Sequence, residues 1–417
     1  MPDLRDFLRR QLGGLPRAYW ALWAGALVNR LGTFVVPFLA LYLTGARGLP
    51  AAAAGLVISL WGLGAIFASA LGGWLADRVG RRGTAVSGLA LGGLSVLALG
   101  FARGLPAIAG ATLLAGFLSE LYRPAVQAAV ADLVPDPAAR VRAYALQYWA
   151  ANVGVSIALV VAGQVAKLSY LALFAADAAT TVAFAAILWR FVPETHPGLA
   201  GASAAAAPEP GPGSSGPRAG GPLGDRVFVA FLVQNFFFAF VFFQHQVAMP
   251  IDMAAHGHSP ATFGLVTALN GALVVLLQPF AGRFVARLDP SRALAVAGVL
   301  TGAGFGLFAV ATSAAGYAAG VALWTVGEIF GLPVAAALVA ALAPARARGR
   351  YQGAYASTFG LAAFAAPAAG GWALRHLGAP ALWAGCLGTG ILFAASQLLA
   401  GGARRRRLAP AVGAGVD

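Results

Sequence analysis

Long runs of apolar residues, joined by short polar or glycine-containing segments, make up most of this 417-residue chain. A helix that crosses a bilayer needs about 20 predominantly apolar residues, and the runs divide the chain into about twelve segments of that kind. The hydrophobic pattern therefore predicts an all-α membrane protein with twelve transmembrane helices. The predicted spans are residues 18–43, 53–76, 83–102, 107–132, 143–165, 170–191, 226–251, 260–283, 292–312, 316–343, 351–374 and 379–400.

Composition and charge lead to the same class of protein. Hydrophobic residues form 59% of the chain and charged residues 10%, whereas soluble proteins carry about 25% charged residues. The net charge of +14 reflects topology, because twenty-two of the 28 basic residues lie at predicted cytoplasmic positions and four in predicted external loops. Cytoplasmic loops of membrane proteins collect Arg and Lys. We therefore expect a multi-pass protein of the inner (plasma) membrane with both termini in the cytoplasm, and no nucleic-acid partner.

The chain divides into two similar halves. Gly55-Leu56-Val57 matches Gly264-Leu265-Val266 at an offset of 209 residues, which indicates a duplicated six-helix unit. Duplications of this kind are typical of transporters whose site lies between the repeats. The segment between the halves is rich in Pro, Gly, Ala and Ser and predicts a flexible linker. The predicted parts are an N-terminal bundle (1–192), a cytoplasmic linker (193–225), a C-terminal bundle (226–403) and a basic tail (404–417) whose Arg404–Arg407 run would bind anionic lipid.

The loop between the second and third predicted spans contains the residue types expected where helices leave a membrane. It reads Gly72-Gly73-Trp74-Leu75-Ala76-Asp77-Arg78-Val79-Gly80-Arg81-Arg82. Glycines let helices approach closely, arginines keep the turn in the cytoplasm, and an acid can bond the free N–H groups at a helix N-terminus. The second half has Ala286 where the first has Asp77, so a gate carboxylate is expected only in the first half. The predicted gate residues are Gly73, Asp77, Arg78, Gly80 and Arg81.

This loop resembles the signature between helices 2 and 3 of the major facilitator superfamily, a large family of secondary transporters. The resemblance implies the major facilitator fold, with two pseudo-symmetric six-helix bundles and a cytoplasmic gate. The chain also lacks a phosphate-binding glycine loop with its lysine and a nucleophile elbow. We therefore expect a transporter that is neither an enzyme nor an ATP-driven pump.

Five ionisable residues fall near the middle of predicted spans: Arg30, Glu120, Arg123, Asp177 and Glu328. A charge at the bilayer centre costs at least about 2.5–3.5 kcal/mol on insertion scales, so these groups should pair, face a cavity or lose their charge. Glu120 and Arg123 are three residues apart and can pair on one helix face. The five groups include two bases and three acids, so one carboxylate is in surplus and can carry a proton. Glu328 is the first candidate for proton coupling, followed by Asp177 and Glu120, with Arg30 and Arg123 as charge partners. The alternative is that all three acids are structural partners.

The start of the fifth span reads Tyr148-Trp149-Ala150-Ala151-Asn152. Together with Glu328 in the tenth span, it resembles the drug:proton antiporter branch, particularly its Gram-positive multidrug exporters. Those exporters can carry an acid immediately before the Tyr-Trp pair, and Gln147 stands at that position here. The resemblance implies efflux of small compounds in exchange for protons.

Aromatic and amide side chains could line a substrate cavity. The predicted cavity residues are Tyr148, Trp149, Asn152, His245, Gln246, Asn270 and Gln278. Such a lining suits lipophilic or cationic compounds. The phenylalanines of the seventh span are better explained by lipid contact and helix packing, because they cover every helix face. Asp252, His256 and His258 cluster near a predicted external loop, where solvation is a better explanation than a metal, so no metal site is expected.

The sequence therefore favours a monomeric, proton-coupled secondary transporter that exports small lipophilic or cationic compounds by alternating access. The proton is the coupling ion, no other cofactor is expected, and the partners are the substrate, protons and the lipid bilayer. One alternative within the same fold is a uniporter or a proton symporter for a sugar or another metabolite. An alternative from another class is a membrane enzyme or scaffold that does not transport.

Overall fold

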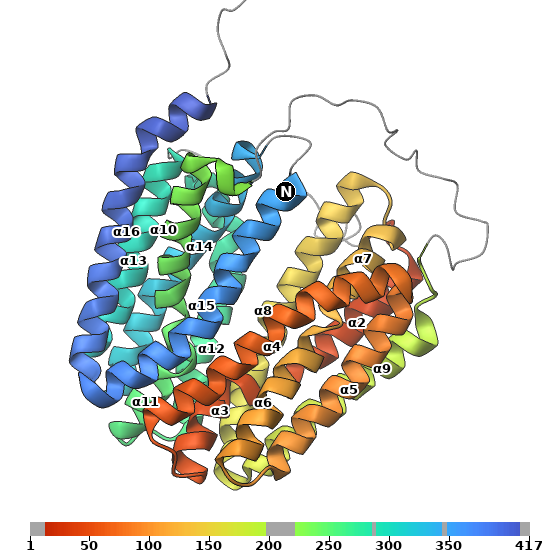
Figure 1. Cartoon of the computed structure of the whole chain (residues 1–417), viewed down its shortest axis with the longest axis horizontal. Coiled ribbons are helices and arrows are strands. Elements are labelled where there is room, and N and C mark those ends of the chain that lie inside the picture. The colour runs from red at the N-terminus through yellow and green to blue at the C-terminus, as the bar shows by residue number, and fades with distance from the viewer. Residues whose placement is uncertain (1–12, 197–221, 286–288, 344–347, 409–417) are drawn as a thin grey trace, which may run out of the picture. The chain divides into compact units, whose positions relative to one another are not determined.

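Helices are the only regular elements among the described residues, which are 13–196, 222–285, 289–343 and 348–408 of this computed structural model (Figure 1). The N-terminal helices are α2 (Arg17–Leu31), α3 (Val35–Leu41), η1 (Tyr42–Ala46), α4 (Ala51–Arg78), α5 (Arg81–Phe101), α6 (Leu105–Glu120), α7 (Arg123–Leu133), α8 (Pro137–Leu168) and α9 (Tyr170–Phe191). The C-terminal helices are η2 (Pro222–Gly224), α10 (Arg226–Phe242), η3 (Phe243–Gln246), α11 (Ala248–Ala255), α12 (Pro260–Val285), α13 (Pro290–Gly306), η4 (Leu307–Ala309), α14 (Ala314–Leu342), α15 (Arg348–His376) and α16 (Ala379–Leu408). The predicted all-α class is confirmed.

Eleven helical segments of the described chain are long and apolar enough to cross a membrane. The remaining predicted span, the eleventh (351–374), lies within α15, a continuous helix of 29 residues. Its many Ala and Gly residues, with Tyr, Ser and Thr among them, make α15 less apolar than the others. Each of the twelve predicted spans therefore corresponds to one helix or to consecutive helical segments, and α16 continues eight residues past the predicted end at 400.

Three predicted spans are interrupted rather than continuous. The first breaks between α2 and α3, the fourth between α6 and α7, and the seventh at η3. Pro37, Pro124 and Pro250 follow these interruptions. Each proline lacks the N–H that would bond the carbonyl four residues earlier, at Thr33, Glu120 or Gln246, so the helix is weakest there.

The chain forms two compact units, and the first contains residues up to Tyr42 together with Leu60–Pro212. Within it α5 packs along α9 and α6, and α2 packs against α8 and α9. Glycines allow the closest approaches: Gly72 lies against the Leu121 backbone and Gly116 against Trp61, with no room for a Cβ atom. Gly73 of the gate loop has open space instead, so only the first of the paired glycines serves helix packing.

The second unit contains Leu43–Ser59 and the chain from Gly213 onward. In this unit α13 packs between α14 and α16, and α10 packs against α15 and α16 (Figure 1). The first turns of α4 belong here because Gly55 lies against the Pro367 carbonyl and Gly371 against the Ala51 carbonyl of the facing helix.

Candidate functional site

Glu328 projects from α14 into a small polar group in the second unit. Its side chain is 9% exposed, and its Oε2 accepts a hydrogen bond of 2.7 Å from the Asn270 amide of α12. The same amide nitrogen donates to Thr325 Oγ1 at 3.0 Å. No basic side chain of the described residues pairs with Glu328, as expected for a surplus carboxylate. Asn270, predicted as a cavity residue, is hydrogen-bonded to this acid.

The interruption of the seventh span places His245 against α14. A bond of 2.6 Å joins His245 Nδ1 to the Phe242 carbonyl, so Nδ1 carries the hydrogen and Nε2 is left as an acceptor. The imidazole lies between Phe243 and Trp324, with ring centroids 6.4 and 5.9 Å away and nearly parallel planes. Trp324 and Glu328 are four residues apart and share a face of α14. The His245 ring is therefore stacked on a residue that lies one helical turn from Glu328 along α14.

Glu120 and Arg123 meet across the interruption of the fourth span. Arg123 Nε lies 2.6 Å from Glu120 Oε2, so the predicted pairing is confirmed. The exposed fractions are 19% for the Glu120 side chain and 49% for Arg123. The ion pair joins the last residue of α6 to the first of α7, and it neutralises one of the three acids inside the spans.

Asp177 of α9 caps the helix that follows the first interruption. Its Oδ2 accepts hydrogen bonds from the backbone N–H groups of Phe34 and Val35 at 3.1 and 3.0 Å. Thr181 donates to its other oxygen at 3.5 Å. Arg30, the predicted charge partner, forms no ion pair with a described residue and packs its Cβ against Gly154 of α8. These contacts give Asp177 a structural role and leave its predicted role in proton coupling open.

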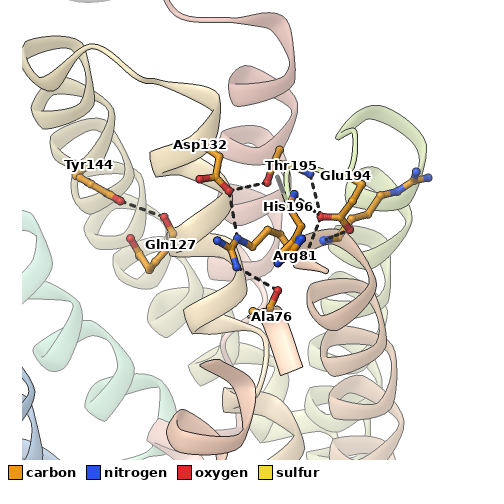
Figure 2. Close-up of polar contacts among 9 residues, drawn as sticks. Ala76, Arg81, Gln127, Asp132, Tyr144, Glu194, Thr195 and His196 are labelled. Atoms are coloured by element: carbon orange, nitrogen blue, oxygen red, sulfur yellow. Dashed lines mark hydrogen bonds and ion pairs between the residues drawn. The ribbon is translucent and has the colours of Figure 1, made fainter. Parts of the chain in front are cut away.

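The gate loop is held by a network within the first unit, drawn in Figure 2. Arg81 Nε lies 3.2 Å from Asp132 Oδ2, and Nη1 donates to the Ala76 carbonyl at 3.1 Å. Thr195 also donates to Asp132 Oδ2, at 3.1 Å. Of the predicted gate residues, Arg81 therefore ties the loop to the ends of α7 and α9.

Glu194 binds the N-terminus of α5 in the same network. Its carboxylate accepts from the backbone N–H groups of Arg81 and Arg82 at 2.8 and 3.0 Å, and also from those of Thr195 and His196. Partial burial by itself would raise the pKa of Glu194, but the four N–H donors outweigh it and hold the pKa below its ordinary value.

The other gate residues are less constrained. The Arg78 guanidinium lies over the Trp74 ring, 4.8 Å from its centroid. Gly80 has a φ of 106° just before α5, a conformation that favours glycine. Asp77 lies in α4, and its side chain is outside the described residues.

The remaining predicted cavity residues belong to both units, with Tyr148, Trp149 and Asn152 in α8 and Gln246 and Gln278 in the second unit. Tyr148 and Trp149 are exposed at 46% and 47%, and Asn152 donates to the Tyr148 carbonyl of its own helix at 2.9 Å. Gln246 and Gln278 are half-buried in the second unit.

Asp252 is not in a solvated loop, which corrects the prediction for the external cluster. It is 3% exposed in α11, and its Oδ2 accepts from Tyr317 at 2.7 Å and from Trp383 Nε1 at 2.9 Å. His256 Nδ1 lies 3.6 Å from Oδ1. The cluster therefore joins α11 to α14 and α16.

Arg404 departs from the predicted lipid-facing tail. It is 2% exposed, and its guanidinium hydrogen-bonds Gln397, Gln234 and Ser291. Arg405 and Arg407 are more exposed and pair with Asp289 and Asp225. Arg404 thus belongs to the packing of the second unit.

A model of the Major Facilitator Superfamily matches residues 22–245 and 231–413. The chain belongs to this superfamily. It is 27% identical to the uncharacterized MFS-type transporter YqjV of Bacillus subtilis, over 74% of this chain and 75% of that protein. It is 28% identical to the uncharacterized MFS-type transporter YttB of the same organism, over 42% of this chain and 44% of that protein.

Solved transporters share the fold. A POT family transporter in complex with a thioalcohol-conjugated peptide has a TM-score of 0.77 at 15% identity, covering 92% of this chain and 96% of that one. The nucleoside transporter NupG has a TM-score of 0.74 at 12% identity, over 94% and 99%. A D-xylose-proton symporter has a TM-score of 0.71 at 16% identity, over 91% and 96%. The protein is therefore a multi-pass secondary transporter and not an enzyme.

Sequence reasoning missed several members of these sites. Glu194 and Thr195 were assigned to the flexible linker that begins at 193, although an acid directly after a span and close to the basic gate loop was a usable signal. Asp132 was counted only as the end of a span. Thr325 had no signal of its own, because its importance comes from Asn270 on another helix.

Proposed function

We propose that this major facilitator protein is a proton-coupled exporter of small lipophilic or cationic compounds, with Glu328 as the coupling carboxylate. The observation that carries the proposal is the environment of Glu328. It is buried in the second unit and receives one amide hydrogen bond, and no described basic side chain compensates its charge. A carboxyl group in such surroundings can exchange a proton as the cavity alternates between the two sides.

The other two intramembrane acids have partners that reduce their suitability. Glu120 is paired with Arg123, and Asp177 is occupied by two backbone N–H groups. Proton binding at either would cost an ion pair or a helix cap. Proton binding at Glu328 would weaken only one amide hydrogen bond. This smaller cost supports Glu328 as the first candidate for proton coupling.

The surroundings of Glu328 also support the substrate class. Trp324 lies one helical turn before Glu328 on α14, and its ring stacks with that of His245. An anionic group close to aromatic rings suits a lipophilic cation, because both the charge and the ring faces attract it. In the proposed cycle, the proton and the substrate compete for Glu328, and the two halves alternate in exposing the cavity.

The test is transport in proteoliposomes with an imposed pH gradient and a panel of lipophilic cations and neutral analogues. The wild type should accumulate a cation inside acidic vesicles, and Glu328→Gln should lose that accumulation while keeping downhill exchange of neutral compounds. Glu120→Gln is the matched control, because its acid is already paired. Uptake that requires acid outside the vesicles would identify a symporter instead. Equal accumulation by Glu328→Gln and wild type would exclude Glu328 as the coupling site.

A further inference from the structure

The groups around Asn270 determine which atom of its amide donates hydrogen bonds. The hydroxyl of Thr325 donates to the Val321 carbonyl at 2.6 Å, so toward Asn270 its oxygen can only accept. The amide nitrogen donates one hydrogen to that oxygen and the other to Glu328 Oε2. With the amide reversed, its oxygen would face the Thr325 oxygen, which can only accept, whether or not Glu328 carries a proton. Thr325, which is fully buried, therefore fixes the direction in which Asn270 donates.

Charged and titratable groups on the surrounding elements do not reach this carboxylate. Among the described residues, Glu328 forms its only hydrogen bond with Asn270 and has no ion pair. Tyr317 of the same helix is bonded to Asp252 of α11. The other described titratable groups on elements in contact with α14 are His245 of η3, which stacks on Trp324, Arg292 of α13, Tyr351, Tyr355, Arg375 and His376 of α15, and Cys386 and Arg404–Arg407 of α16.

We propose that Asn270 is a positioning residue that sets the orientation and proton affinity of Glu328, with Thr325 holding its amide. The inference rests on the proposed function, since it gives Asn270 its role through the coupling acid. An amide N–H donates more strongly to an ionised carboxylate than to a protonated one. Loss of the donor therefore makes the protonated acid comparatively more stable. Asn270 acts in this way on the coupling step instead of contacting substrate.

The chain offers a matched control for this arrangement. Asn235 of α10 donates to Thr358 Oγ1 at 2.5 Å, and Thr358 donates to the Tyr355 carbonyl at 2.7 Å. This second Asn–Thr pair is buried in the same unit and has no carboxylate bonded to it. Its removal costs a comparable hydrogen bond and leaves Glu328 untouched.

The decisive measurement is an infrared titration of the full-length protein, following the carboxyl C=O band that disappears in Glu328→Gln. Asn270→Leu should move the midpoint of that band upward by about one pH unit, the shift expected for loss of a charge-assisted hydrogen bond. Thr325→Val, which keeps the side-chain shape, should move it in the same direction by less. Thr325→Ser and Asn235→Leu should leave it unchanged.

The outcomes separate this inference from the proposed function. A midpoint unchanged in both Asn270→Leu and Thr325→Val overturns the positioning role, even if Glu328→Gln abolishes coupling. An upward shift supports it even if Glu328→Gln still concentrates substrate, a result that would overturn only the proposed function. A change in substrate KM without any shift of the band would make Asn270 a cavity residue. In the Glu328→Gln background, Asn270→Leu should cause no further change in the pH profile of transport.

Discussion

At the scale of single residues, the three intramembrane acids differ in the groups that bond their carboxylates. Glu120 faces a guanidinium, Asp177 faces two backbone N–H groups, and Glu328 faces one amide. The sequence was sufficient to find all three and to pair Glu120 with its helix neighbour, because that partner is three residues away. It placed Glu328 before Asp177 but could not show which groups bond either carboxylate, since those partners come from distant helices. The environment of each acid, rather than its depth in a span, distinguishes a structural group from a candidate proton carrier.

The first prediction at this scale concerns Glu194, which caps α5 beside the gate loop. Because its pKa is lower in the folded protein than in the unfolded chain, its contribution to stability is present above the ordinary glutamate pKa of about 4.3. That contribution is lost as the pH falls through the folded-state pKa. Glu194→Gln should therefore lower the melting temperature at pH 7 and have a much smaller effect in strongly acidic buffer. Thermal unfolding in detergent at the two pH values measures this difference in melting temperature. The control is Asp136→Asn, which replaces the carboxylate that caps α8. An equal loss at both pH values would contradict the assignment.

At the scale of helices, the interruptions are the main feature that the hydrophobic pattern could not show. Pro37, Pro124 and Pro250 follow the three breaks, yet Pro333 and Pro367 lie inside continuous helices. Proline removes a backbone donor in every case, so proline alone cannot decide where a helix breaks. At the first break the free N–H groups at the start of α3 find an acceptor on another helix, the Asp177 carboxylate. Such partners are found only when the helices are packed.

The element-scale prediction concerns the end of α16. Arg404 joins three helices through Gln234 of α10, Ser291 of α13 and Gln397 of its own helix. Arg404→Leu should lower the free energy of unfolding by about 2 kcal/mol, because hydrogen bonds to a buried charged group are lost. Arg406→Leu, on an exposed position of the same turn, should change stability little. Denaturation in detergent tests the difference, and equal effects of the two substitutions would favour the lipid-binding tail that the sequence predicted.

At the scale of the whole molecule, the duplicated halves were readable because equivalent glycines and prolines recur at a constant offset. The family also followed from one loop, whose residues have a specific use at a membrane boundary. The substrate does not follow in the same way. Solved structures of the same fold include peptide, nucleoside and xylose transporters, because the residues of the site, and not the fold, determine what a transporter binds.

The last prediction follows from the asymmetry between the halves. Asp77 has no counterpart in the second half, where Ala286 occupies the matching position, and we expect it to latch the cytoplasmic side by binding the N-terminus of the helix that begins near Tyr351. Asp77→Asn should reduce transport and increase the population open to the cytoplasm, with expression retained. Spin labels at Pro135 and Leu223, in a background with Cys386→Ala, would report the distance between the two halves at the ends that are predicted to be cytoplasmic. Asp132→Asn is the control, because Asp132 binds Arg81 within one unit and its loss should loosen the loop without removing the latch. Unchanged distances in Asp77→Asn, with a melting temperature equal to that of the wild type, would show that this carboxylate does not hold the gate.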